Sequence, residues 1–522
     1  MMPNTPQEGQ FQGQYQAPTP YVMPTKPSLP FKTYDRVLAI ATLALGFIFW
    51  KWEILFVPSL GLGIFLFFIL TIAVGLIYME YHGIKQNTKS LICLAIIVGS
   101  LLPFILFDRI DIEFFLNLFI ITLYVVWVSY SCNTNIAEKL SGFVASDLIN
   151  QWIIVPFSNF GNIFICIFKR NGENKKEKRV FAAIIGIIVS IPIIVLIISL
   201  LIAADDGFAN LAKNLPNLLN AVTFDNMIYF IFGIPVACYI FGSVSGNSNK
   251  RSTGKITKEG TATTLANAHK IPTASIYAPL IILNILYVVF FIAMGSYLFS
   301  AFAGDLPNAY TYAEYARKGF FELCGVSAIN LIIIIFVYCF TKRNPGCYPK
   351  NLRGLTGILS GLTILLIATA MSKMLLYIGA YGLTRLRVYT LWFMILLLIT
   401  FIVILIWHIR PFNAGKPIAI AFVAMVMILF LSNTDGLIAK YNFDQYKNGA
   451  LPEIDVWNMT YMSDAVVPYL NELKNNASDK SVRDQATQAI YTRKEHSSYE
   501  YNPAAPDFLR WNLQSHRVSN IE

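Results

Sequence analysis

Charged and aromatic side chains that could recognise or transform a ligand gather in three short polar stretches of an otherwise apolar chain. The stretches are Tyr310–Leu323, Lys373–Tyr389 and Asn433–Asn442, and Asp464 follows the third. Arginine offers a planar, bidentate donor for carboxylates, while tyrosine offers a ring and a hydroxyl. The candidate site residues are Tyr312, Glu314, Tyr315, Arg317, Lys373, Arg385, Arg387, Tyr389, Asn433, Asp435, Asn442 and Asp464.

These residues allow three kinds of chemistry. If the arginines pair with the carboxylates, they form a clamp that fixes loops and tail to a helical bundle. If they surround a pocket, they could bind an anionic or zwitterionic substrate. Catalysis would need Glu314, Asp435 or Asp464 in an open cleft with a raised pKa. Lys373 lies inside an apolar run, where an ionisable group is often functional but can also extend toward the membrane surface.

Common catalytic and metal-binding motifs are absent from the sequence. There is no P-loop, HExxH or GxSxG motif, and no Cys/His group has zinc spacing. The five histidines are far apart in the chain. We therefore predict no catalytic residue, no metal site and no cofactor.

Long apolar runs must position the polar stretches. Only 13% of the 522 residues are charged, against about 25% in soluble domains, and the mean hydropathy is +0.55. A membrane-spanning helix needs roughly 20 apolar residues. The sequence thus predicts an all-α integral membrane protein with about eleven spans. They are Arg36–Trp50, Pro58–Tyr78, Ser90–Phe107, Phe114–Tyr130, Val180–Ala204, Met227–Val244, Ser275–Phe302, Phe321–Phe340, Leu355–Met374, Val388–Trp407 and Ile418–Leu431.

One further apolar stretch, Trp152–Phe168, is interrupted by proline, glycine and asparagine. We interpret it as an interfacial or re-entrant helix. Whether it crosses the membrane is left open, because a crossing would reverse every later orientation. Within the spans, Gly357 and Gly361 form a GxxxG motif that predicts close helix contact.

The charges of the loops predict an orientation. With a cytoplasmic N-terminus and eleven spans, the inner segments hold 22 Lys/Arg and the outer loops hold 7. Basic loops stay in the cytoplasm, so the tail is expected outside it. The tail from Ser432 holds 9 Lys/Arg and 12 Asp/Glu, so the positive charge lies in the membrane part, with 31 Lys/Arg against 18 Asp/Glu. The net charge of +10 therefore does not indicate nucleic-acid binding.

We therefore divide the chain into five parts. Residues 1–35 are a Pro/Gln-rich cytoplasmic arm whose composition predicts disorder. Residues 36–131 hold four spans, and residues 132–179 are a cytoplasmic segment with the helix at 152–168 and a basic run. Residues 180–431 form a seven-helix core, and residues 432–522 form a small, mainly helical tail outside the cytoplasm.

The polar stretches also resemble a known family. The strings YTYAEYARKGFFEL, YGLTRLRVY and NTDGLIAKYN, with a later Ser-Asp-Ala, are similar to bacterial membrane proteins known as domain of unknown function 4173, related to the 4153 group. The resemblance runs from about the fifth span to Leu473. It implies a polytopic protein of a bacterial cytoplasmic membrane and brings no established activity.

We expect a non-enzymatic protein that recognises a ligand or an envelope protein on its outer face, in sensing or assembly. The first alternative is a permease for a small or lipid-like solute, which predicts a polar cavity lined by Lys373 or Asn330. The second alternative is a lipid or cell-wall enzyme. The lipid bilayer is the expected surrounding, and the sequence does not indicate an oligomeric state.

Overall fold

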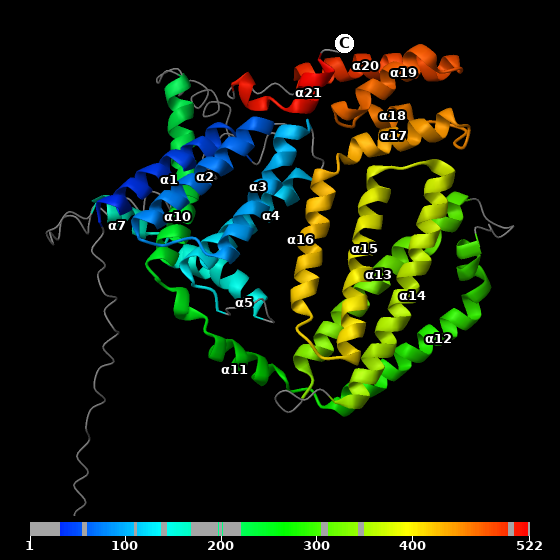
Figure 1. Ribbon diagram of the computed structural model, residues 1–522, viewed down its shortest axis with the longest axis horizontal. Helices are drawn as coiled ribbons and strands as arrows, with labels where there is room; N and C mark the ends of the chain where they lie inside the picture. The colour runs from blue at the N-terminus through cyan, green and yellow to red at the C-terminus, as the bar shows by residue number, and fades with distance from the viewer. Residues whose placement is uncertain are drawn as a thin grey trace, which may run out of the picture.

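The computed structural model describes residues 32–54, 60–108, 112–136, 143–168, 221–303, 312–342, 349–499 and 506–519, together with Ile197 and Leu201. In these residues the chain is helical and contains no strand beyond one isolated bridge (Figure 1). Ten described helices are long and apolar enough to cross a membrane, or eleven if one bent pair is one span. This confirms the predicted all-α multi-pass fold. The arm up to residue 31 and the span predicted at 180–204 lie outside the described residues, apart from Ile197 and Leu201.

In the described part of the chain, a first bundle contains five long helices that share one apolar core around Trp127 and Phe241. Its closest crossing joins the first and last of these helices at Gly46 and Gly233, where each glycine faces the backbone of the other. A side chain at either position would collide with a main chain, so the two backbones approach closely because neither residue has a Cβ. The helices are α1 (Thr33–Lys51), α2 (Gly61–Tyr81), α3 (Thr88–Leu106), α4 (Glu113–Cys132) and α10 (Ala221–Ser248).

The stretch predicted to be interfacial is a chain of short helices between α4 and α10. Length and composition alone would allow Val144–Phe168 to cross a membrane. Its hydrogen bonds, however, reach residues at the ends of α4 and α10: Gln151 Nε2 donates to Thr134 O, and Asn159 Nδ2 donates to Arg251 O. Its pieces are α5 (Val144–Ile149), the π-helix η1 (Asn150–Ile154), α6 (Val155–Ser158) and α7 (Asn162–Phe168).

A second bundle has its own apolar core around Leu359, Leu366 and Phe401. Polar side chains also bond inside it: Asn330 Nδ2 donates to Thr363 Oγ1 at 2.9 Å, and Tyr287 OH donates to Asn330 Oδ1 at 2.8 Å. Such interhelical bonds satisfy polar groups away from water. The helices are α12 (Thr273–Ala303), α13 (Tyr312–Phe340), α14 (Lys350–Tyr381) and α15 (Arg385–Ile409).

Two helices connect the bundles: one leads from the first to the second at the end away from the tail, and the other runs between them. α11 (Lys258–Ala268) follows the 3₁₀ turn η2 (Thr253–Lys255) and leads from α10 to α12. α16 (Gly415–Leu431) packs against α15 and α3 and places Val426 and Phe430 in the core of the first bundle (Figure 1). Within the predicted core at 180–431, the described part of α10 packs mainly with α1 of the first bundle, while α12–α15 pack with one another.

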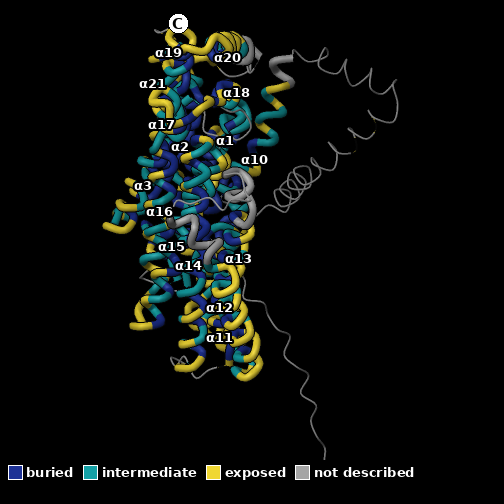
Figure 2. The backbone as a smooth tube through the Cα atoms, turned by 90° about the vertical axis from the view of Figure 1, so that its right-hand side faces the viewer, coloured by how far each residue is buried: buried dark blue, intermediate teal, exposed yellow. Residues whose placement is uncertain are grey.

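The outer surface of the helices is apolar. In the second bundle Ile292 is 78% exposed, Ile282 66% and Ile332 64%. Figure 2 shows such exposed positions along the outside of the helices and buried positions between them. Isoleucine rows of this kind face lipid in a membrane protein, since in water they would form a large unfavourable patch.

The tail forms a third core around Ile438, Leu470 and Ala486 and lies at the end of the molecule where α14 ends and α15 begins (Figure 1). Its last part, residues 506–519, which we name the C-terminal strap, returns to the first bundle, where Leu62 N donates to Trp511 O at 3.2 Å. The tail elements are α17 (Thr434–Lys447), α18 (Val456–Thr460), η3 (Asp464–Val466), α19 (Val467–Asn476), α20 (Lys480–Tyr499), η4 (Asp507–Arg510) and α21 (Leu513–Val518).

Candidate functional site

An ion pair joins the second bundle to the tail. Arg385 is the first residue of α15, and Asp435 lies in the first turn of α17, where a carboxylate is favourable. Arg385 Nε donates to Asp435 Oδ1 and Arg385 Nη2 donates to Asp435 Oδ2, both at 2.7 Å. The side chains are 19% and 8% exposed. This is a bidentate, largely desolvated pair of the kind that fixes orientation.

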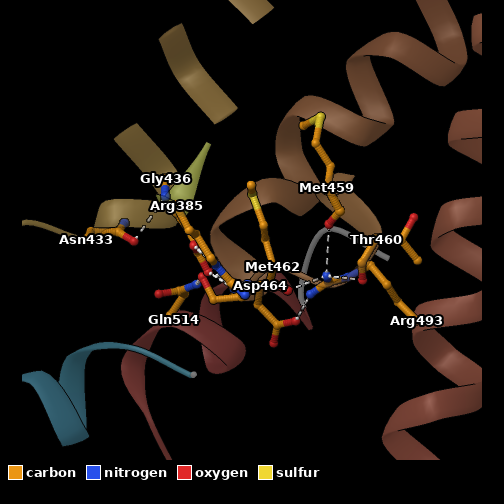
Figure 3. A network of polar contacts seen from close by, with 11 residues as sticks. Arg385, Asn433, Gly436, Met459, Thr460, Met462, Asp464, Arg493 and Gln514 are labelled. Atoms are coloured by element: carbon orange, nitrogen blue, oxygen red, sulfur yellow. Dashed lines mark hydrogen bonds and ion pairs between the residues drawn. The ribbon is translucent and has the colours of Figure 1, made fainter. Parts of the chain in front are cut away.

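The network continues from Asp435 into the rest of the tail (Figure 3). Ser463 N donates to Asp435 Oδ2 at 2.7 Å. The next residue, Asp464, pairs with Arg493 Nη2 at 2.7 Å and accepts a hydrogen bond from Ser515 Oγ at 2.7 Å. Because Ser515 belongs to the C-terminal strap, one set of polar contacts connects α15, α17, η3, α20 and the strap.

Arg493 is the second cation of this network. Its Nη1 donates to Thr460 O at 3.0 Å and to Met462 O at 2.5 Å, so it fixes the turn that precedes Asp464. The side chain is 13% exposed. Asp435 and Asp464, two of the three carboxylates considered for an enzyme mechanism, are therefore both paired with arginine.

The two predicted asparagines shape the backbone at the same junction. Asn433 has φ of 40° and accepts a hydrogen bond from Gly436 N at 3.3 Å, so it caps α17. Asn442 binds the turn between α14 and α15 with both amide atoms: Nδ2 donates to Leu383 O at 2.8 Å, and Oδ1 accepts from Leu383 N at 2.6 Å. The preceding Gly382 has φ of 75° and lets this turn form.

Arg387 stabilises the same turn from the side of α15. Its Nη1 donates to Tyr381 O at 3.0 Å and also to Gly382 O, and its guanidinium lies 4.0 Å from the centre of the Tyr377 ring. Tyr389 follows one position after Val388 in α15 and is half-buried. Arg387 thus acts on backbone and ring, while Arg385 binds the carboxylate.

Lys373 is enclosed by protein, with 1% of its surface exposed. It lies two turns before the end of α14, and Glu322 on α13 acts on it electrostatically. The four candidates from the first polar stretch begin α13, which starts at the same end as the tail. Their side chains lie outside the described part of the structure. These candidates are Tyr312, Glu314, Tyr315 and Arg317.

A cavity of about 660 Å³ lies beside the network, between the α14–α15 turn and the tail. Its walls come from residues 380–387, α17, the segment 451–458 and the start of α20. Of the predicted site residues, Arg387 and Asn442 line it. The size falls within the usual range of small-molecule sites, about 300–1,000 Å³.

The structure therefore brings Arg385, Asp435 and Asp464 into one network and places Arg387 and Asn442 at the adjacent cavity. Reasoning from the sequence missed Arg493, which completes the network, and Trp457, which lines the cavity and is 63% exposed. The sequence signal that could have been used for Trp457 is its place two residues after Asp455, in a polar segment of the tail. Arg493 gave none, because it lies 29 residues from its partner Asp464 on an ordinary polar helix.

Comparison with protein families assigns the chain. Residues 92–473, well over half of the sequence, match the family described as Domain of unknown function (DUF4153). The protein belongs to this family, and it is a multi-pass membrane protein. The resemblance pointed to the 4173 group and to a start at the fifth span, whereas the match is to the related 4153 family and starts in α3. Neither curated proteins nor solved structures gave a match.

Proposed function

We propose that the protein is a non-enzymatic membrane receptor or assembly factor that recognises a ligand or envelope partner at the junction of tail and bundle. The single observation that carries the proposal is the 660 Å³ cavity, whose walls are held by the Asn442 clamp and lie next to the Arg385–Asp435 pair. A pocket of this size with preformed walls loses little entropy when a ligand binds.

The same proposal places the tail outside the cytoplasm of a bacterial cell. Its support is the distribution of basic residues, 22 on the expected inner segments and 7 on the expected outer loops. A cysteine introduced at exposed Ser478 should react with a membrane-impermeant maleimide in whole cells. Labelling only after lysis would reverse the orientation.

The ligand-binding proposal is tested with a variant in which a larger side chain fills part of the cavity. Ser481 lines the cavity at the start of α20 and is exposed, so Ser481→Trp reduces the volume without disturbing a core. A library of soluble envelope metabolites is screened by thermal shift on the purified full chain. We expect a ligand that raises the melting temperature of the wild type and not of Ser481→Trp. The matched control is Thr487→Trp, an exposed position on α20 that does not line the cavity.

A permease is the second candidate, and buried Lys373 favours it, since an ionisable group inside a membrane helix is costly. Against it, Asn330 and Thr363 bond to each other between the helices of the second bundle. Proteoliposomes with the wild type or with Lys373→Met would separate the two readings. If the protein is a receptor, any ligand found in the screen should bind without being taken up into the proteoliposomes. Uptake that Lys373→Met abolishes would favour the permease.

A further inference from the structure

The charge of the cavity narrows the chemistry of its ligand, and this inference rests on the proposed function. Of the residues that the structure describes, three acidic side chains and one basic side chain line the cavity, which gives this part of the lining a net charge of −2. The acidic residues are Glu453, Asp455 and Asp479, and the basic residue is Arg387. A lining of this sign repels anions and attracts cations.

The single cation of the lining is already engaged. Arg387 donates to the carbonyl oxygens of Tyr381 and Gly382 and lies on the Tyr377 ring. Its charge is therefore directed at the α14–α15 turn. A ligand carboxylate or phosphate would have to compete with these contacts.

The carboxylates keep free acceptor capacity. Asp455 gives one oxygen to Asn458 N at 2.9 Å, and Asp479 gives one oxygen to Ser481 N at 2.8 Å. Each of these aspartates caps a helix and retains a second oxygen. Among the described residues, Glu453 makes no hydrogen bond or ion pair, so both of its oxygens are open to a ligand.

Aromatic rings in the same cavity point independently to a cation. Trp457 is 63% exposed and Tyr381 is 50% exposed, although both line the cavity wall. A ligand ammonium over such ring faces is attracted by the negative face of the π-system, and aromatic sites that bind quaternary ammonium groups work in this way. An indole also gains from being covered, because its large apolar surface leaves water.

We propose that the cavity binds an organic ammonium group, between the Trp457 face and the Glu453 carboxylate. The α14–α15 turn that forms one wall joins two helices that are long and apolar enough to span a membrane, so we place the cavity near the level of lipid headgroups. Two sources share this chemistry: the headgroup of a choline or ethanolamine lipid, and a free amine of the same class.

The test uses the full chain in a micelle that contains no ammonium lipid. Choline chloride is titrated by isothermal calorimetry, and 3,3-dimethylbutan-1-ol serves as the neutral molecule of the same shape. We expect choline to bind at least about tenfold more tightly than the neutral molecule. Equal affinities, or no binding of choline, would overturn the proposal.

Two variants locate the site. Glu453→Gln removes the open carboxylate and Trp457→Ala removes the ring, and each should weaken choline binding about tenfold or more. Asp484→Asn and Tyr491→Ala are the matched controls, because both residues are exposed on α20 and neither lines the cavity. Unchanged affinity in both cavity variants contradicts the assignment. All four positions are exposed, so these substitutions should leave folding intact.

Reconstitution separates the sources. If the natural occupant is a lipid headgroup, phosphatidylcholine in the nanodisc should compete with choline and weaken its binding compared with nanodiscs of phosphatidylglycerol. If the natural occupant is a free amine, choline should bind equally in both. The ammonium proposal can also be wrong while the proposed function is right. If choline does not bind but the thermal-shift screen finds a ligand that Ser481→Trp excludes, the ammonium class is wrong and the proposed function stands.

Discussion

The first bundle and the tail junction hold helices together by different means. In the first bundle, α1 crosses α10 at Gly46 and Gly233, and α10 meets α6 at Gly242, where a Cβ would lie 2.5 Å from Pro156 O. At the junction, α15 is tied to α17 by the Arg385–Asp435 pair. One interface depends on the absence of side chains and the other on two charged ones.

The difference follows from the surroundings of each interface. Lipid tails are as apolar as leucine, so helices inside a membrane associate through close packing and small residues. At the boundary with water a bidentate Arg–carboxylate pair can form, because part of each group stays solvated while the hydrogen bonds fix its geometry. The molecule therefore places backbone contact within the bundle and ionic contact where the tail is attached.

The largest expected effect comes from filling the α1–α10 crossing. In Gly46→Val the new side chain meets the backbone of Gly233, which cannot move away as a flexible side chain could. Overpacking usually costs about 1–3 kcal/mol, and more where the new atoms meet a backbone that cannot give way, as they do here. We therefore expect loss of the monodisperse folded protein in size-exclusion chromatography. Gly361→Val is the matched control inside a span, because nothing lies within 4 Å of a Cβ at that position. Similar losses in both variants would contradict the contrast.

Breaking the ionic contact should release the tail and leave the bundle folded. Asp435→Ala strands Arg385 and frees Ser463 N, and removing one partner of a buried pair costs about 3 kcal/mol. Hydrogen exchange should increase in α17 and η3 while α1–α4 stay protected. Asp444→Ala, an exposed position on the same helix, controls for loss of charge. Equal exchange in the two variants would mean that the ion pair does not attach the tail.

A neutral contact at the same junction should have a smaller effect. Asn442→Ala removes both bonds to the half-buried Leu383, and a hydrogen bond that is only partly shielded from water contributes about 0.5–1.5 kcal/mol. The expected result is faster hydrogen exchange at the α14–α15 turn and a weaker response to any cavity ligand. Asn448→Ala, an exposed asparagine just beyond α17, is the control. If Asn442→Ala leaves the turn protected, the clamp does not hold the cavity wall.

The sequence predicted the spans because each is a long apolar run, and it identified Arg385 and Asp435 because charges are rare in such a chain. It did not predict the glycine contacts. The GxxxG at Gly357 and Gly361 was expected to mediate close packing. A Cβ added at Gly357, however, would meet only the His408 side chain, at an ordinary contact distance of 3.7 Å, and a Cβ at Gly361 would face open space. Which glycine meets a backbone depends on how helices distant in the chain cross, and local spacing does not carry that information.

The smallest effect is expected at a charged pair that water surrounds. Lys447 Nζ lies 3.0 Å from Glu472 Oε1, and the side chains are 63% and 40% exposed. Exposed pairs contribute about 0–1 kcal/mol because solvent screens them and ordering long side chains costs entropy. Lys447→Ala should therefore change hydrogen exchange in α17 and α19 far less than Asp435→Ala. If the two variants were equally destabilising, charge alone and not the desolvated geometry of Arg385 and Asp435 would attach the tail.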